Sequence, residues 1–440
     1  MSAAGSASPE GEDEAVAAHL LDALGLGLLG ADGEGVLRAR RAAPSDGAFV
    51  MSLAIGALGL DDFDEATRAH PGTVLVPALV EATVASAEPV SGRAFGAALS
   101  AGYALFAGYG RMADAGTLHL RGFHPSALLG PLSAAGAVAV LHGGDRDAAT
   151  RAARVAASFA SGITEFDAKE TMRGVQTAWA ASTGLRAAAL VEAGFDASAA
   201  AIDGRAGLLG RTHGEAEGWD AGDPWTEAEV VARVSFKPYP HFSDLHPATS
   251  ALIRLLADDP TLASRVDAVT VTLRTAKAAR LSTEHPPSMP KTAKRSTRFV
   301  FASCLVQARR TGDPARLIGA FAAESLRDAE VLALAERVHP RSAAEAVEDV
   351  VEVTTVDGEV LTAAAAGYPG DGRDPALRWG LDAVRARLHA ATAELPRADA
   401  ALAAELADAV ARLEEQLDLR PLLGRFRSRL LTGATHSAKD

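Results

Sequence analysis

Two histidines in this sequence stand where a loop passes into an apolar helix, and each has neighbours that could support acid–base chemistry. His70 precedes a Pro-Gly pair and an apolar run, and it follows an acidic loop that contains Asp61 and Asp62. His124 lies in the segment Arg-Gly-Phe-His-Pro-Ser, directly before a second, very apolar run. Imidazole exchanges protons near neutral pH, and a carboxylate can orient it. A plainer interpretation also fits, in which these residues only cap helices and the acids are solvated.

A third junction carries a cation. Lys237 opens the segment Lys-Pro-Tyr-Pro-His, which is predicted to end a strand, and His246 follows with another proline before a helical run. Proline stiffens such a junction, and a lysine at the end of a strand that faces a helix N-terminus suits a carboxylate. The alternative is an ordinary surface loop. The basic residues between Lys291 and Arg298 are expected to form a solvated face.

No metal or cofactor is expected. Cys304 is the single cysteine, which excludes a disulfide within the chain and a zinc or iron–sulfur site held by cysteines. His119, His142 and His285 show no paired ligand spacing. The sequence Gly-Leu-Gly-Leu-Leu-Gly at 25–30 has the spacing of a dinucleotide-binding loop, but it closes a predicted helix instead of opening one.

Charge and hydropathy restrict the partners. A net charge of −13 argues against nucleic acid and against a stable contact with an anionic membrane. The N-terminal residues are small, polar and acidic, unlike a signal peptide. The longest apolar run, residues 127–141, is shorter than a membrane span and predicts a buried core helix. A cytoplasmic protein is therefore expected.

The pattern of residue types along the chain predicts a mainly α protein with an α+β second domain. Long stretches rich in Ala, Leu and Val alternate with Gly, Pro and Asp up to about residue 225, which is typical of an all-helical bundle. Short runs of β-branched residues then appear in 229–240, 267–275 and 348–366, mixed with helical runs. The bundle is expected to be split in sequence around a smaller inserted lid. The predicted parts are a disordered tail 1–13, helical domain 14–233, inserted α+β lid domain 234–374, returning helices 375–427 and tail 428–440.

In their order, these junctions resemble the MmgE/PrpD family, which includes 2-methylcitrate dehydratase, cis-aconitate decarboxylase and iminodisuccinate epimerase. The resemblance runs from about residue 14 to 425. It rests on the following segments: Ala48-Phe49-Val50, Asp61-Asp62, His70-Pro71-Gly72, Gly102-Tyr103, Gly122-Phe123-His124-Pro125, Ala160-Ser161-Gly162, Glu165-Phe166, Trp179-Ala180-Ala181, Ala193-Gly194-Phe195, Lys237-Pro238-Tyr239-Pro240 and Ala293-Lys294.

The family resemblance implies a large helical domain, a smaller lid, a homodimer and a cofactor-free active site between the domains. It places Arg173 where relatives carry an active-site lysine, and Gln176 where they carry a nearby histidine. Phe242 takes the place of a histidine seen in decarboxylases, with His241 one residue earlier, and Phe299 replaces a tyrosine. Two registers of the acidic loop at 59–65 remain open. One aligns Gly59 with the first Asp of relatives and Asp61 and Asp62 with their final pair, and the other makes Asp62 the first acid.

The expected function is a cofactor-free lyase, of the dehydratase or decarboxylase type, that acts on a small carboxylate. Arginine anchors a carboxylate but is a poor base, so Arg173 favours a reaction other than methylcitrate dehydration. A proton-transfer isomerase or epimerase and a catalytically silent binding protein remain alternatives. The predicted catalytic residues are His70, His124 and Asp62, and the predicted substrate-binding residues are Arg173, Lys237, His241 and Asp61.

Overall fold

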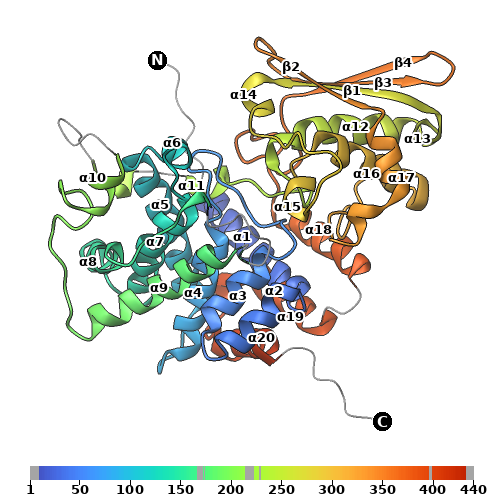
Figure 1. Cartoon of the computed structure of the whole chain (residues 1–440). Coiled ribbons are helices and arrows are strands. Elements are labelled where there is room, and N and C mark those ends of the chain that lie inside the picture. Colours follow the sequence, from blue (N-terminus) through green and yellow to red (C-terminus); the bar gives the residue numbers. More distant parts are fainter. Residues whose placement is uncertain are drawn as a thin grey trace. The chain divides into compact units, whose positions relative to one another are not determined.

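The computed structural model describes residues 9–165, 172, 174–213, 222–226, 229–395 and 399–432. These residues fall into two compact units. Unit 1 contains the residues up to 236 together with those from 378 onward, and unit 2 contains residues 237–377. Helices dominate and a small mixed sheet is added to them, which confirms the predicted fold class (Figure 1).

Unit 1 is a layered helical bundle. Its central helix α7 is buried along nearly its whole surface, because α4, α5, α8 and α9 pack around it. This explains why α7 is apolar on all sides. The main helices of unit 1 are α1 (Pro9–Gly30), α2 (Glu34–Ala42), α3 (Gly47–Gly56), α4 (Gly72–Ala85), α5 (Gly92–Met112), α7 (Pro125–Leu141), α8 (Arg146–Ala157), α9 (Val175–Glu192), α10 (Leu208–His213), α11 (Val230–Arg233), α18 (Leu381–Glu394), α19 (Ala400–Ala411) and α20 (Arg420–Thr432).

Glycines let α4, α7 and α9 approach one another closely. A Cβ atom added to Gly130 of α7 would lie 3.0 Å from Val74 of α4 and 3.2 Å from Ala180 of α9. Farther along, a Cβ atom on Gly184 of α9 would lie 2.5 Å from Ala134 of α7. The contacts of α7 with α9 advance in the same direction along both helices. The same holds for α7 and α4, because the backbone N–H of His70 donates to Ser126 Oγ four residues before the Val74–Gly130 contact, so the three helices run parallel.

The Gly-rich segment at 25–30 ends helix α1, as predicted, and serves packing. A Cβ atom on Gly25 would meet Leu388 of α18 at 2.4 Å, and one on Gly27 would meet Phe426 of α20 at 2.9 Å. A Cβ atom on Gly30 would lie 2.1 Å from the carbonyl oxygen of Ala54. The glycines therefore let α18, α20 and α3 approach α1 closely, from different sides of the helix.

Unit 2 is built on a four-stranded sheet with the order β2-β1-β3-β4. Strand β1 (Val266–Arg274) pairs parallel with β2 (Val338–Ala343) and antiparallel with β3 (Asp349–Thr355), and β3 pairs antiparallel with β4 (Val360–Ala365). Val269, Val271, Val351 and Val353 are buried at every second position. That alternation is typical of a sheet with one face against a core.

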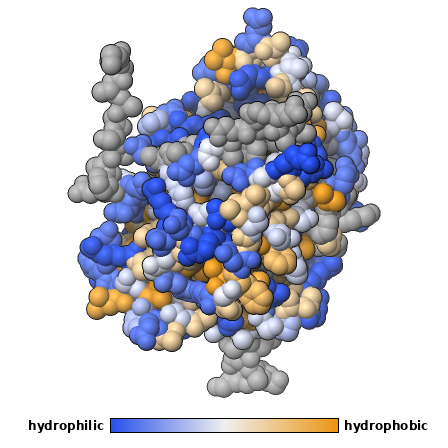
Figure 2. Space-filling view, turned by 90° about the vertical axis from the view of Figure 1, so that its left-hand side faces the viewer, coloured by the Kyte–Doolittle hydropathy of each residue, from blue (hydrophilic) through white to orange (hydrophobic). Residues whose placement is uncertain are grey.

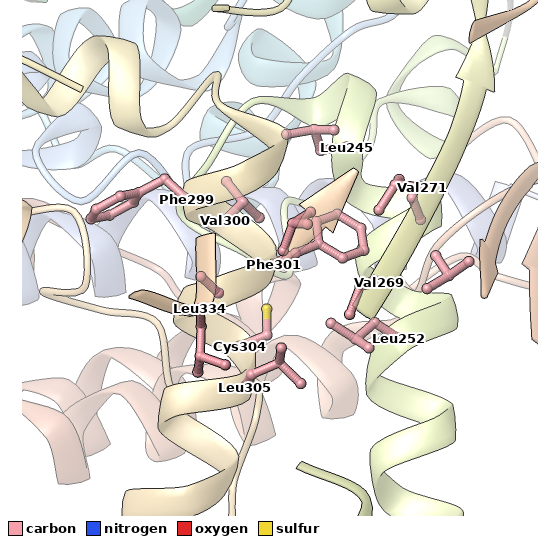
Figure 3. Close-up of a cluster of buried hydrophobic side chains, with 14 of the residues drawn as sticks. Leu245, Leu252, Val269, Val271, Phe299, Val300, Phe301, Cys304, Leu305 and Leu334 are labelled. Carbon is pink, nitrogen blue, oxygen red and sulfur yellow. The ribbon is translucent and has the colours of Figure 1, made fainter. Parts of the chain in front are cut away.

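Two helices provide that core, α12 (His246–Asp258) and α16 (Thr297–Thr311). Helix α12 packs on β3 and β4, and α16 packs on β2 and on α17 (Ala329–Ala335). Cys304 lies on α16 among buried aliphatic and aromatic side chains (Figure 3). Burial raises the pKa of its thiol to about 12, so the cysteine acts as a small core residue.

The structure corrects three local predictions. The strand predicted in 229–240 is wrong, because Val230–Arg233 forms helix α11 and only an isolated bridge joins Ser235 to Phe63. Val230 and Val231 are buried, so their side chains fill the core of unit 1 instead of a sheet. Strand β2 was not predicted, because its sequence Val-His-Pro-Arg-Ser-Ala lacks β-branched alternation. Helices α1 and α20 also extend into the predicted tails, to Pro9 and Thr432.

Among the described helices, no single one is long and apolar enough to cross a membrane. The pair Gly11–Gly30 and Glu34–Ala42 meets the length and composition requirement together, but it is bent by 87°. In the first of these helices, Val16, Leu20 and Leu24 are at most 3% exposed within unit 1.

The close packing of α7 and α9 can be tested by adding one methyl group. Gly184→Ala should lower the free energy of unfolding by about 1–3 kcal/mol, because the new Cβ overlaps Ala134. Gly424→Ala is the matched control, since Gly424 lies inside α20 with no atom within 4 Å of its added Cβ. It should raise stability by about 0.5–1 kcal/mol. Urea unfolding would measure both, and equal effects would contradict the close approach.

Candidate active site

A tight loop in unit 1 brings His70 back beside the acidic pair. Asp64 and Ala69 pair with each other through their backbones, and Phe63 pairs with Ser235. The Asp64 carboxylate accepts hydrogen bonds from the backbone N–H groups of Ala66 and Thr67, which fixes the turn. The chain thus reverses between residues 64 and 69, directly before α4.

Asp61 is the acid that faces His70. The imidazole Nδ1 lies 2.8 Å from Asp61 Oδ2 and 2.7 Å from the carbonyl oxygen of Asp62. A hydrogen on Nδ1 can donate to both oxygens, which leaves Nε2 as the nitrogen that can take up a proton. The His70 side chain is 27% exposed and that of Asp61 is 10% exposed. This pair therefore has the arrangement of a base and its orienting carboxylate.

The Asp62 side chain points the other way, into the core. Its carboxylate accepts hydrogen bonds from the backbone N–H of Gly72 at 3.0 Å and from the hydroxyl of Tyr103 on α5 at 2.8 Å. His19 Nδ1 on α1 lies 3.7 Å away, beyond hydrogen-bond distance. Because neighbouring residues in an extended segment point to opposite sides, only one of the two acids can face His70.

Burial dominates the ionisation of this inner group. It raises the pKa of the Asp62 carboxyl to about 7, against the opposing effects of the Tyr103 hydroxyl, the nearby His70 ring and the Gly72 N–H. Burial also lowers the pKa of His19 to about 3, so its ring is neutral. The His19 ring stacks on Phe236, with centroids 4.1 Å apart. It fills space beside the carboxylate and adds no positive charge.

A buried ion pair holds the start of the acidic loop. Arg387 on α18 pairs with Asp22 on α1, and its guanidinium donates to the carbonyl oxygen of Leu60 at 3.1 Å. Removing one partner of such a pair would leave an uncompensated buried charge, a loss of about 3–5 kcal/mol. The loop is therefore tied to the helical core just before Asp61.

Three parallel helices begin next to this loop (Figure 1). The backbone N–H of His70, just before α4, donates to Ser126 Oγ in the first turn of α7 at 3.0 Å. A Cβ atom on Gly162 would lie 3.2 Å both from His124 Cβ, before α7, and from Gln176 Oε1, in the first turn of α9. The N-termini of α4, α7 and α9 therefore meet, and their dipoles together favour an anion there.

His124 is the N-cap of α7. Its Nδ1 accepts a hydrogen bond from the backbone N–H of Ala127 at 3.3 Å, so Nε2 carries the hydrogen in the neutral ring. This is the opposite of the tautomer that Asp61 favours at His70. The structure thus shows His124 as a helix cap, and its acid–base role remains a prediction.

Gln176 fixes the segment beside His124. Its side-chain amide accepts from the backbone N–H of Ile163 at 2.8 Å and donates to the carbonyl oxygen of the same residue at 3.1 Å. The backbone N–H of His124 in turn donates to the carbonyl oxygen of Gly162 at 3.1 Å. Gln176 thus holds the chain that carries His124. Arg173, the predicted substrate anchor, lies outside the described residues.

The other predicted residues belong to unit 2. Lys237 is 8% exposed and His241 is 2% exposed. The His241 ring stacks on Tyr239 and meets His246 edge-on, and burial lowers its pKa to about 3. In the structure His241 is thus a neutral, enclosed ring. Its predicted role in substrate binding remains a prediction, and so does that of Lys237.

A known protein family matches the part of the chain that holds the acidic loop. Residues 35–217 match the family described as MmgE/PrpD N-terminal domain. The protein called "Cis-aconitate decarboxylase-like protein oryM" of Aspergillus oryzae (strain ATCC 42149 / RIB 40) is 31% identical over 161 residues. Residues 35–217, which include the acidic loop, are therefore similar to the N-terminal domain of the MmgE/PrpD family. That relative is matched over 36% of this chain and 33% of its own length.

The family match covers one group of predicted residues and not the other. Asp61, Asp62, His70 and His124 all lie within residues 35–217, whereas Lys237 and unit 2 lie beyond them. Sequence reasoning gave no role to Tyr103, although it lies in one of the quoted family segments, and nothing distinguished His19 from other residues of an apolar helix. Among the described residues, no three His, Cys, Asp or Glu side chains are grouped so as to hold a metal ion.

The buried carboxyl group of Asp62 should make the free energy of unfolding depend on pH, and a comparison with Asp62→Asn separates its contribution from those of other groups. Its pKa is raised on folding to about 7, so the folded state keeps a proton that the unfolded state releases near pH 4. Stability from this group is therefore present at low pH and is lost as the pH rises toward 7. The unfolding free energy of the wild type minus that of Asp62→Asn should fall by about 2–3 kcal/mol between pH 5 and pH 8. A difference that stays constant in urea titrations would show that Asp62 is ionised throughout.

Proposed function

We propose that this protein is a member of the MmgE/PrpD family and a lyase of the decarboxylase or dehydratase type that acts on a small carboxylate with two or three acid groups. The family match and the name of the Aspergillus relative support the reaction type. The observation that carries the proposal is the His70–Asp61 pair at the point where α4 and α7 begin. A base, an orienting acid and an anion-favouring helix terminus meet there.

The two histidines are proposed to have opposite tasks. His70, with Nδ1 held by Asp61, is the base that removes a proton from the carbon next to a substrate carboxylate. His124 is the acid in its protonated form: Nδ1, which accepts from the Ala127 N–H in the neutral ring, takes up a proton, and Nε2 then gives its proton to the substrate and leaves a neutral ring. In a dehydration the acid protonates the leaving hydroxyl, which departs as water. In a decarboxylation CO₂ departs, and a protonated ring returns a proton to the carbon.

The negative charge that develops next to the carboxylate must be stabilised. The N-termini of α4, α7 and α9 supply partial positive charge and backbone donors. Arg173 and Lys237 are proposed to hold the carboxylates themselves, an assignment that rests on the family resemblance. The buried Asp62 is assigned a structural task instead of the catalytic one predicted for it, because its oxygens are taken up by Gly72 and Tyr103. No metal or cofactor is part of the proposal.

Two other functions differ from this one in measurable products. An epimerase or isomerase would exchange the substrate proton with solvent without loss of water or CO₂. A silent binding protein would hold a carboxylate without turnover. Nuclear magnetic resonance of a panel of hydroxylated and unsaturated di- and tricarboxylic acids in D₂O separates the three outcomes. Loss of CO₂ or water supports the lyase.

Substitution of the histidines tests their assigned tasks. His70→Gln and His124→Gln should each lower turnover by roughly 10²–10⁴-fold, because each removes a proton-transferring group. His142→Gln is the control, since His142 pairs with Glu192 at the surface, away from the acidic loop. Its turnover should equal that of the wild type. Full activity in His70→Gln would exclude His70 as the base.

The expected homodimer also remains a proposal. Several large apolar side chains of unit 1 are exposed, including Phe159 at 53%, Trp179 at 53% and Phe195 at 62%. The space-filling view of the face that carries α8 and α10 shows hydrophobic patches among polar residues (Figure 2). Exposed apolar patches are typical of association surfaces. Light scattering at micromolar concentration should give twice the mass of the chain, and a monomer would contradict the proposal.

A further inference from the structure

Asp62 links the core of unit 1 to His70, the proposed base, because its side chain and its backbone carbonyl have different partners. Its carboxylate points inward to the Tyr103 hydroxyl and to the Gly72 N–H. Its carbonyl oxygen points outward and lies 2.7 Å from His70 Nδ1. Tyr103 itself lies in the middle of α5 and is 1% exposed. The buried Tyr103 hydroxyl is thus connected through Asp62 to the partly exposed imidazole of His70.

We propose that Tyr103 is a positioning residue for His70, which acts through Asp62 by fixing the segment that carries both acids. The inference rests on the proposed role of His70 only for its effect on catalysis. Tyr103 touches neither His70 nor a substrate, so it is not a catalytic residue. Its hydroxyl holds the Asp62 carboxylate, and this keeps the Asp62 carbonyl and the Asp61 carboxylate aimed at Nδ1.

The surroundings of Asp62 leave this task to Tyr103. A buried carboxylate needs hydrogen bonds or a positive charge. On α1, His19 is neutral and 3.7 Å away. The remaining side-chain donor that contacts the carboxylate in the described part of the chain is the Tyr103 hydroxyl, and the Gly72 N–H is the backbone donor.

The other charged groups near the loop have tasks of their own. Arg387 on α18 pairs with Asp22 on α1 and donates to the Leu60 carbonyl oxygen, so it holds the loop at the residue directly before Asp61. On the loop itself, Asp61 pairs with His70, and Asp64 closes the turn through Thr67. Among these groups, Asp62 alone joins α5 to the His70 ring, so the hydroxyl of Tyr103 can be removed without disturbing another ion pair.

The test is Tyr103→Phe, read through the titration of the His70 ring in protein labelled with ¹⁵N-histidine. The His70 signal is assigned by its absence in His70→Gln. Without the hydroxyl, Asp62 holds its proton to higher pH, and the ring loses a nearby negative charge. The His70 signals should therefore titrate at lower pH in Tyr103→Phe than in the wild type, because less negative charge lies beside the ring. Turnover should fall by about 10-fold, with KM within about two-fold if binding is unchanged.

Tyr109→Phe is the matched control. Tyr109 lies on the same helix and is equally buried, and its hydroxyl has no hydrogen-bond partner among the described residues. Loss of that hydroxyl should leave both the His70 titration and turnover unchanged. If Tyr103→Phe lowers thermal stability without moving the His70 midpoint, Tyr103 is structural only and the inference is overturned. If Tyr103→Phe does not fold, Asp62→Asn must show the same shift, and an unmoved midpoint there also overturns it.

The titration needs no substrate, so the two proposals fail separately. A shifted midpoint together with full turnover in His70→Gln would keep the positioning role and reject His70 as the base. An unshifted midpoint together with an inactive His70→Gln would keep the base and reject Tyr103 as its positioning residue.

Discussion

The carboxylate of Asp62, buried at the start of α4, is the constraint on which the site depends. An acid in the core is unfavourable unless donors surround it, and those donors are the first N–H of a helix and a phenol from the middle of another. The arrangement fixes where α4 begins, which way the preceding extended segment faces, and therefore which side of it carries Asp61. The geometry of His70 follows from those three consequences.

Parallel packing extends this local constraint to a common helix terminus. Because Gly130 lets α4 and α9 approach α7 within the first two turns, the three helices start at one level. Each N-terminus has unpaired N–H groups, and neighbours satisfy part of them: Asp62 at α4 and His124 at α7. The same packing that removes space between the helices thus concentrates positive potential where His70 and His124 lie.

How much of this the sequence could predict differs between the elements. The helical bundle, strands β1, β3 and β4, and the junctions at His70 and His124 follow from apolar periodicity, β-branched runs and Pro-Gly punctuation. The helix at Val230–Arg233 could not be predicted, because its valines read as strand residues until the core they fill is known. The choice between Asp61 and Asp62 likewise depends on which side of the loop is buried, and adjacent identical residues give no information on that. The role of Tyr103 could not be predicted either, because in the sequence it is a tyrosine in an apolar helix and only the structure shows its hydrogen bond to Asp62.

Gln176 shows how the same scaffold can carry a reduced set of proton-transferring groups. The family resemblance places a histidine of relatives at this residue, yet here a neutral amide binds both backbone groups of Ile163. An amide donates and accepts at once without titrating, so it supports the Gly162–His124 segment equally at any pH. In this chain Gln176 thus supports the segment that carries His124. In the proposed mechanism His70 and His124 carry the proton transfers, His70 as the base and His124, when protonated, as the acid of a single elimination or decarboxylation.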